Sequence, residues 1–205
     1  MSQSSSNLHP VKAFDLTGTR MLITGAAGGI GQETAKLCSQ LGATMVLSDV
    51  VEPARLEQLA SEIKGVVATE RCDVTQRDAV EAMVKRHGPF SALVDTAGIC
   101  PFDDDWMSPD WNETSFMKVM RVNVLGPINL ARAVMPGMIE RKYGRIAFCG
   151  SIAGWAGGVR AGPHYSASKG GVHAFVRWLA QRGTPHNVLV NAVAPGPIET
   201  GMTTT

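Results

Sequence analysis

The amino-acid sequence predicts an α/β fold, a doubly wound parallel sheet formed by a single domain. Short apolar segments that end in polar or glycine-rich turns alternate with segments of helical periodicity. This alternation is typical of a mostly parallel sheet with right-handed crossovers. The length of 205 residues suits one domain with a substantial core. The net charge of +1 is ordinary for a globular protein and does not indicate a nucleic-acid partner.

The expected elements follow one another in a regular order. Residues 1–12 are rich in serine and are expected to form a mobile, disordered leader, so the domain covers 13–205. We expect strands near residues 21–24, 44–48, 65–71, 90–94, 144–150 and 188–193. We expect a helix from the first glycine-rich turn through Leu41, then helices near 53–64, 75–87 and 111–141, and one that carries Tyr165 and runs to about 182.

Several residues mark expected helix boundaries. Thr75 is a plausible N-cap, and Gly88 is expected to stop the same helix. The long segment 111–141 contains Gly126 with Pro127, and later Pro136. We expect a bend or a break at these positions, because proline interrupts the helical hydrogen bonds.

The first strand leads into a turn that reads Gly25, Ala26, Ala27, Gly28, Gly29, Ile30, Gly31. A strand that turns through glycines into a helix presents backbone donors and the positive end of the helix dipole to a phosphate. Glycine lets the pyrophosphate approach closely and lets the helix pack against the strand. A plain turn is the alternative, but the flanking strand and helix favour a dinucleotide site.

Asp49 ends the second strand, about twenty residues beyond the glycines. A carboxylate there accepts hydrogen bonds from the ribose hydroxyls of adenosine and repels a 2'-phosphate. The next residues, Val50 and Val51, include no arginine. NAD is therefore favoured over NADP, although Asp49 could instead cap the next turn.

Two further groups of polar residues call for separate interpretations. The three carboxylates Asp103–Asp105 suggest a metal ligand set, but consecutive residues seldom converge on one ion, so a surface turn is expected and no metal site is predicted. Asn123 lies among apolar neighbours in a helical segment, so its amide must find partners.

The four cysteines lack the spacing of a zinc or redox site and are expected to be reduced packing residues.

Tyr165 and Lys169 lie four residues apart in a segment of helical pattern. This step advances about one turn, so the phenol and the ammonium emerge on the same face. A neighbouring cation favours the phenolate, which ordinarily forms only near pH 10. An exposed tyrosine and lysine without a special role is the alternative for this pair taken alone.

Together these motifs resemble the short-chain dehydrogenase/reductase family, whose fold is Rossmann-type. The likeness covers the chain from about Phe14 onward, and the order of the motifs is more specific than any one of them. The matching residues are Thr24, Gly25, Gly29, Ile30, Gly31, Asp49, Asp73, Val74, Ala97, Gly98, Asn123, Ser151, Tyr165, Lys169, Pro195 and Gly196.

The resemblance implies an NAD-dependent oxidoreductase that interconverts a secondary alcohol and a ketone. Tyr165 would be the general acid or base, and Lys169 would lower its pKa and bind the nicotinamide ribose. Ser151 would hold the substrate oxygen, and Asn123 would anchor a water chain that returns the proton. The cofactor would be contacted by these two residues, Tyr165 and Lys169, and by Gly25, Gly28, Gly29, Ile30, Gly31, Asp49, Asp73, Val74, Ala97, Gly98, Pro195, Gly196, Ile198 and Thr200.

The chain departs from the family pattern in two places. Asp95 and Thr96 stand where the family usually has asparagines, which puts sheet or cofactor contacts there in doubt. Members typically continue beyond the point where this sequence ends, so we expect the last strand and the substrate lid to be missing. The sequence could belong to a fragment or to an incompletely recorded protein.

The alternative function is a non-catalytic NAD-binding scaffold or an inactive truncated fragment. For the enzyme, 3-hydroxyacyl or 3-oxoacyl, steroid-like and polyol substrates are all possible, and the residues that could shape the pocket are Phe102, Trp106, Trp155, Val159 and His164. The resemblance implies a homodimer or homotetramer, with Phe175 and Trp178 suited to subunit contact. The apolar runs are too short to span a membrane, and no secretion signal precedes them, so a cytoplasmic protein is expected.

Overall fold

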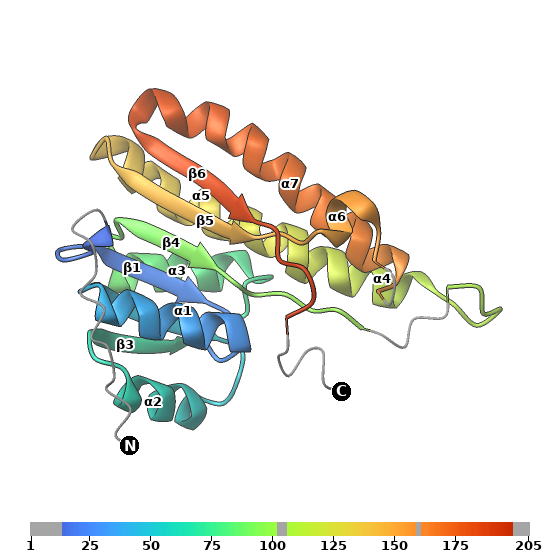
Figure 1. The fold of residues 1–205 in the computed structure, drawn as a ribbon, viewed down its shortest axis with the longest axis horizontal. Coiled ribbons are helices and arrows are strands. Elements are labelled where there is room, and N and C mark those ends of the chain that lie inside the picture. Colours follow the sequence, from blue (N-terminus) through green and yellow to red (C-terminus); the bar gives the residue numbers. More distant parts are fainter. Residues whose placement is uncertain (1–13, 102–105, 159–160, 199–205) are drawn as a thin grey trace, which may run out of the picture.

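The protein is a single α/β domain built on a parallel six-stranded sheet (Figure 1). The computed structural model describes residues 14–101, 106–158 and 161–198. The predicted leader and Asp103–Asp105 lie outside the described residues. The strand order is β3-β2-β1-β4-β5-β6. The strands are β1 (Arg20–Thr24), β2 (Thr44–Asp49), β3 (Val66–Arg71), β4 (Ala92–Asp95), β5 (Gly144–Cys149) and β6 (Val188–Val193).

The helices lie on both faces of this sheet. The first face is covered by α1 (Gly29–Gln40) and α2 (Pro53–Glu62), and the second by α3 (Arg77–His87), α5 (Gly126–Glu140) and α7 (Pro163–Gly183). The change of face at β3 reverses the direction in which strands are added, which is the doubly wound arrangement. Shorter segments complete the fold, namely α4 (Glu113–Met120), a π-helical turn η2 (Arg121–Leu125), α6 (Ala153–Ala156) and a 3-10 turn η3 (Thr184–His186).

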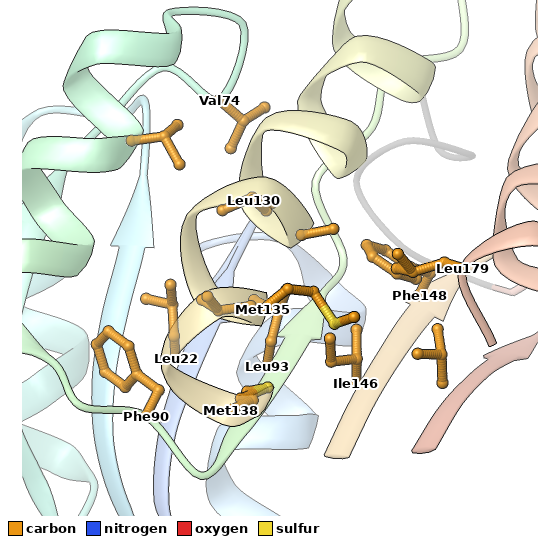
Figure 2. Packing of buried hydrophobic residues seen from close by; sticks show 14 of the residues in the cluster. Leu22, Val74, Phe90, Leu93, Leu130, Met135, Met138, Ile146, Phe148 and Leu179 are labelled. Atoms are coloured by element: carbon orange, nitrogen blue, oxygen red, sulfur yellow. The ribbon is translucent and has the colours of Figure 1, made fainter. Parts of the chain in front are cut away.

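Two apolar cores, one on each face, hold the layers together. On the second face, Leu130, Met135 and Met138 of α5 pack onto Leu93 of β4 and Ile146 of β5, as Figure 2 shows. The opposite core joins the β1 and β2 side chains to α1 and α2. Since adjacent strand residues point to opposite faces, these short strands are apolar on both sides, as buried parallel strands are.

The predicted fold class is confirmed, but one predicted helix boundary was wrong. Thr75 is not the N-cap of α3, because the helix begins at Arg77 after Gln76, and the Thr75 amide donates to Asp73 Oδ1 at 2.9 Å. Pro136 lies inside α5 and does not break it, and a bend at Pro136 stays a prediction. No break occurs at Gly126; the irregularity is the π-helical turn just before it.

Candidate functional site

A pocket of about 1360 Å³ opens at the carboxyl ends of β1, β2 and β4. Its position agrees with the rule that ligands bind beyond the carboxyl ends of parallel strands, where the strand order reverses. The pocket is lined by most of the predicted cofactor residues, namely Gly25, Gly28, Gly29, Ile30, Gly31, Asp49, Asp73, Val74, Ala97 and Gly98.

The glycine-rich turn forms the floor of this pocket and requires glycine at two positions. Gly25 has a φ of +66°, and a Cβ there would lie 2.5 Å from the Ala97 amide nitrogen. A Cβ on Gly31 would overlap the Gly25 carbonyl oxygen. The glycines therefore expose backbone at the amino end of α1, which is the kind of surface that a pyrophosphate can approach closely.

Asp49 is held in place by two backbone amides. Its Oδ2 accepts from Ala27 at 2.9 Å and its Oδ1 from Val50 at 2.7 Å. The carboxylate thus ties the end of β2 to the glycine-rich turn. Arg55 of α2 also lines the pocket, and its guanidinium donates to the Ala27 carbonyl at 3.3 Å. A cation therefore lies near Asp49 although the residues directly after Asp49 are valines.

The end of β4 shows how Asp95 and Thr96 fit in place of asparagines. Asp95 Oδ1 accepts from the Thr24 hydroxyl at 2.7 Å and from the Ala97 amide at 3.0 Å. The Thr96 hydroxyl donates to the Thr24 carbonyl at 2.8 Å. Both residues therefore join β4 to β1 beneath the pocket. Burial raises the pKa of the Asp95 carboxyl to about 6, against the lowering effects of Thr24, Ala97 and Lys169.

Asn123 lies in the π-helical turn and joins two distant segments. Its amide accepts from Ile99 N–H at 2.9 Å and donates to the Ile99 carbonyl at 2.9 Å. It also donates to Ser168 Oγ at 3.0 Å, and Ser168 donates in turn to the Tyr165 carbonyl at 2.7 Å. The side chain thus fixes the segment after β4 against the helix that carries Tyr165. Its implied role in a water chain stays a prediction.

Ser151, Tyr165 and Lys169 meet between the carboxyl end of β5 and α7. The Lys169 ammonium lies 5.7 Å from the centre of the Tyr165 ring and donates to the Cys149 carbonyl at 2.7 Å. A Cβ on Gly98 would lie 3.5 Å from Lys169 Nζ and 3.4 Å from Asn123 Oδ1. The four predicted catalytic residues therefore gather beside the Gly98 wall of the pocket.

Burial dominates the protonation of this cluster. It raises the pKa of the Tyr165 phenol above its usual value, while a hydrogen bond with the Ser151 side chain acts to lower it. Burial also lowers the pKa of Lys169, and nearby Asp95 acts to raise it. The lowering of the tyrosine pKa expected from the resemblance is thus outweighed by desolvation.

The remaining predicted residues lie apart from the pocket or outside the described residues. The Pro195 carbonyl accepts from Ile152 N–H at 3.1 Å, and Gly196 lies against the Ile152 side chain. Ile198 is exposed. Trp106 and Trp155, suggested as pocket walls, are also exposed, whereas His164 is fully buried. Thr200, Phe102 and Val159 lie outside the described residues.

Two side chains of this region were missed by sequence reasoning. Arg55 reaches the pocket from α2, and no local sequence pattern near Asp49 predicts that it does. His173 contacts the Ser151 backbone from α7. Its position, one further turn beyond Tyr165 and Lys169 on the same helix face, was a signal that could have found it.

The chain is similar to several known proteins. The sequence profile described as short chain dehydrogenase matches residues 19–205. A 3-oxoacyl-[acyl-carrier-protein] reductase of Thermotoga maritima is 37% identical over 92% of this chain and 77% of its own. A 2-keto-3-deoxy-L-fuconate dehydrogenase of Xanthomonas campestris is 34% identical over 90% of this chain and 60% of its own. A 3-oxoacyl-[acyl-carrier protein] reductase of Brucella melitensis, solved with bound NAD, superposes with a TM-score of 0.83 at 31% identity and covers 92% of this chain and 74% of its own.

Proposed function

Because the chain belongs to the short chain dehydrogenase family, we propose that it interconverts a secondary alcohol and a ketone by hydride transfer with NAD. The observation that carries the proposal is the grouping of Ser151, Tyr165 and Lys169 beside a glycine-floored pocket. The bound nicotinamide would supply the hydride. The protein's own residues then have to orient the substrate and move one proton.

In the direction of ketone reduction, Tyr165 donates the proton to the carbonyl oxygen. Burial raises the pKa of its phenol, which therefore keeps its proton at neutral pH, as a donor requires. The Ser151 hydroxyl donates a second hydrogen bond to the same oxygen as its charge grows. In the reverse direction Tyr165 is the base, and the Lys169 ammonium, 5.7 Å from the ring centre, stabilises the phenolate.

The pocket accommodates a dinucleotide, with the backbone of the glycine-rich turn at the pyrophosphate. Gly25 and Gly31 leave the space that their side chains would otherwise fill. Asp49 would accept from the adenosine ribose, which favours NAD, and NAD is bound in one similar solved structure. Asp73 and Val74 would flank the adenine, and Lys169 would bind the nicotinamide ribose.

The relatives suggest the substrate class. Two of them are named for 3-oxoacyl groups carried by an acyl carrier protein, and one for a keto-deoxy sugar acid. Each of these substrates contains a ketone or the corresponding secondary alcohol. A 3-oxoacyl thioester is therefore the first substrate to test, with sugar-derived ketones second.

We also propose a cytoplasmic homodimer or homotetramer. In the described part of the chain, no helix combines the length and the apolar character needed to cross a bilayer. Trp178 on α7 is half exposed and stacks on Phe175 with ring centres 6.1 Å apart, so this apolar surface suits subunit contact. The oligomeric state is measured by sedimentation or light scattering.

The activity test compares the wild type with Tyr165→Phe. The wild type should oxidise NADH in the presence of a 3-oxoacyl thioester, and the variant should be slower by about 10²- to 10⁴-fold, because the proton donor is removed. Equal rates would remove Tyr165 from the mechanism. Binding of NADH without turnover by the wild type would instead support the non-catalytic scaffold.

A further inference from the structure

A buried histidine lies against the backbone of Ser151. His173 projects from α7, is only 5% exposed, and its Nε2 accepts from Ser151 N–H at 3.3 Å. The approach is possible because residue 150 is glycine, since a Cβ there would overlap the imidazole. Residue 150 therefore has to be glycine for the ring to reach the end of β5.

The geometry fixes the tautomer of this ring. Nε2 can accept only when it carries no proton, so the neutral imidazole has its proton on Nδ1. Burial lowers the pKa of His173, and the positive charges of Arg177 and Lys169 lower it further. Nδ1 has no hydrogen-bond partner among the described residues. A buried donor without a partner is costly, so the ring is held there by its other contacts.

Those contacts come from α6. The indole of Trp155 lies over His173 with ring centres 4.4 Å apart. Helix α6 can pack this closely on α7 because Gly154 and Gly170 meet, and a Cβ on Gly154 would lie 2.7 Å from the Gly170 amide. The histidine is thus clamped between Trp155 on one side and the end of β5 on the other.

Ser151 is consequently held at two points. Its N–H is bound by His173, and its Oγ accepts from the Ala153 amide at 3.1 Å. Resting on the proposed oxidoreductase function, we propose that His173 is a positioning residue that fixes the Ser151 backbone, so that the hydroxyl stays aimed at the substrate oxygen and Tyr165.

Histidine supplies a hydrogen-bond acceptor that an apolar residue of similar size lacks. Leucine would fill a comparable volume between Trp155 and β5, but it would leave the buried Ser151 N–H without an acceptor. The row Tyr165, Lys169, His173 occupies one face of α7 at steps of four residues. One helix therefore presents the proton donor, the cation and the support for the serine.

The kinetic test uses His173→Leu, His173→Gln and a matched control. Leucine removes the acceptor, and kcat for ketone reduction should fall about tenfold while the Kd for NADH stays within about twofold, since only the serine is misplaced. The glutamine amide oxygen can reach the same position and should restore most of kcat. Val176→Ala, a buried residue on the same helix, should lower the melting temperature without lowering kcat.

A spectroscopic test does not depend on turnover. The imidazole nitrogen shifts of ¹⁵N-labelled protein should show Nδ1 protonated and Nε2 unprotonated for His173, and the Ser151 amide signal should move in His173→Leu. If Nε2 carries the proton, or if leucine retains full kcat, the positioning role is overturned. A wild type that reduces no ketone would refute the oxidoreductase proposal, while the nitrogen shifts would still decide whether His173 holds Ser151.

Discussion

The proposed cofactor pocket and the proposed catalytic cluster are built in opposite ways. The floor of the pocket is backbone, and Gly25 and Gly31 keep it bare of side chains. In the catalytic cluster the side chains already bind protein groups, since Asn123 is joined to Ile99 and Ser168, and Lys169 to the Cys149 carbonyl. The pocket floor has no side chains at Gly25 and Gly31, whereas the side chains of the cluster are fixed by hydrogen bonds within the protein. Variants in the two regions should therefore fail in different ways.

The largest effect is expected when a side chain is introduced into the glycine-rich floor of the pocket. Gly31→Val would drive its side chain into the Gly25 carbonyl. We expect a loss of unfolding free energy of about 3 kcal/mol or more and no measurable NADH binding, because the turn must move. Denaturant unfolding measures the unfolding free energy, and fluorescence titration measures NADH binding. Gly171→Ala, whose Cβ would meet Val124 at an ordinary 3.4 Å, is the control and should bind NADH normally.

Substitutions of two buried asparagines should distinguish the pocket from the cluster most clearly. Asn123→Ala leaves both Ile99 backbone groups without their partner and should cost about 2–4 kcal/mol, with kcat lowered at least about tenfold. Asn129 of α5 donates to the carbonyl of Val74, which is proposed to flank the adenine, so Asn129→Ala should weaken NADH binding and leave kcat nearly unchanged. The same kcat loss in both variants would mean that the two regions are not separable.

Asp95 lies between the regions, and its titration gives a pH prediction. Its folded pKa of about 6 is above the ordinary 3.8, so its stabilising contribution is full below pH 3.8 and is lost as the pH rises through 6. Two units correspond to roughly 3 kcal/mol. Asp95→Asn keeps an oxygen acceptor for Thr24 and Ala97 and should therefore be more stable than the wild type at pH 8, by an amount that shrinks toward pH 5.

Melting temperatures at several pH values measure this difference. Asp110→Asn, at an exposed position, is the control and should show no such trend. A wild-type advantage at pH 8 would show that the ionised carboxylate, through its attraction to Lys169, stabilises the folded protein more than its burial costs.

The smallest effect is expected at the adenosine end of the pocket. Asp49→Ser removes the charge that repels a 2'-phosphate and should improve the affinity for NADPH relative to NADH about tenfold. Arg55 lines the same part of the pocket, so adding Arg55→Gln should reverse part of that gain. Titration of both cofactors measures the ratio. An unchanged ratio in Asp49→Ser would remove this carboxylate as the determinant of cofactor choice.

Local patterns predicted the parts of this protein that depend on neighbouring residues. The apolar strands and the glycine-rich turn are short, and the four-residue step from Tyr165 to Lys169 is a property of one helix, so these could be foreseen. Arg55 could not be placed in the same way, because it enters the site through the packing of α2, whereas the next four-residue step on α7 places His173 on the same face but does not show that it contacts Ser151. The helix does not break at Pro136, because the tertiary contacts of α5 outweigh the loss of one helical hydrogen bond, and a local pattern does not reveal these contacts.

The π-helical turn Arg121–Leu125 lets one continuous helical segment contact two different parts of the protein. Asn123, within the turn, faces Ile99, whereas Gly126 and Asn129, in α5 after the turn, face Val74. A turn of this kind holds one residue more than a regular turn, which rotates everything downstream by about 100°. Deleting that extra residue would swing α5 out of phase, so insertions and deletions here should be tolerated far less than in the loops around it.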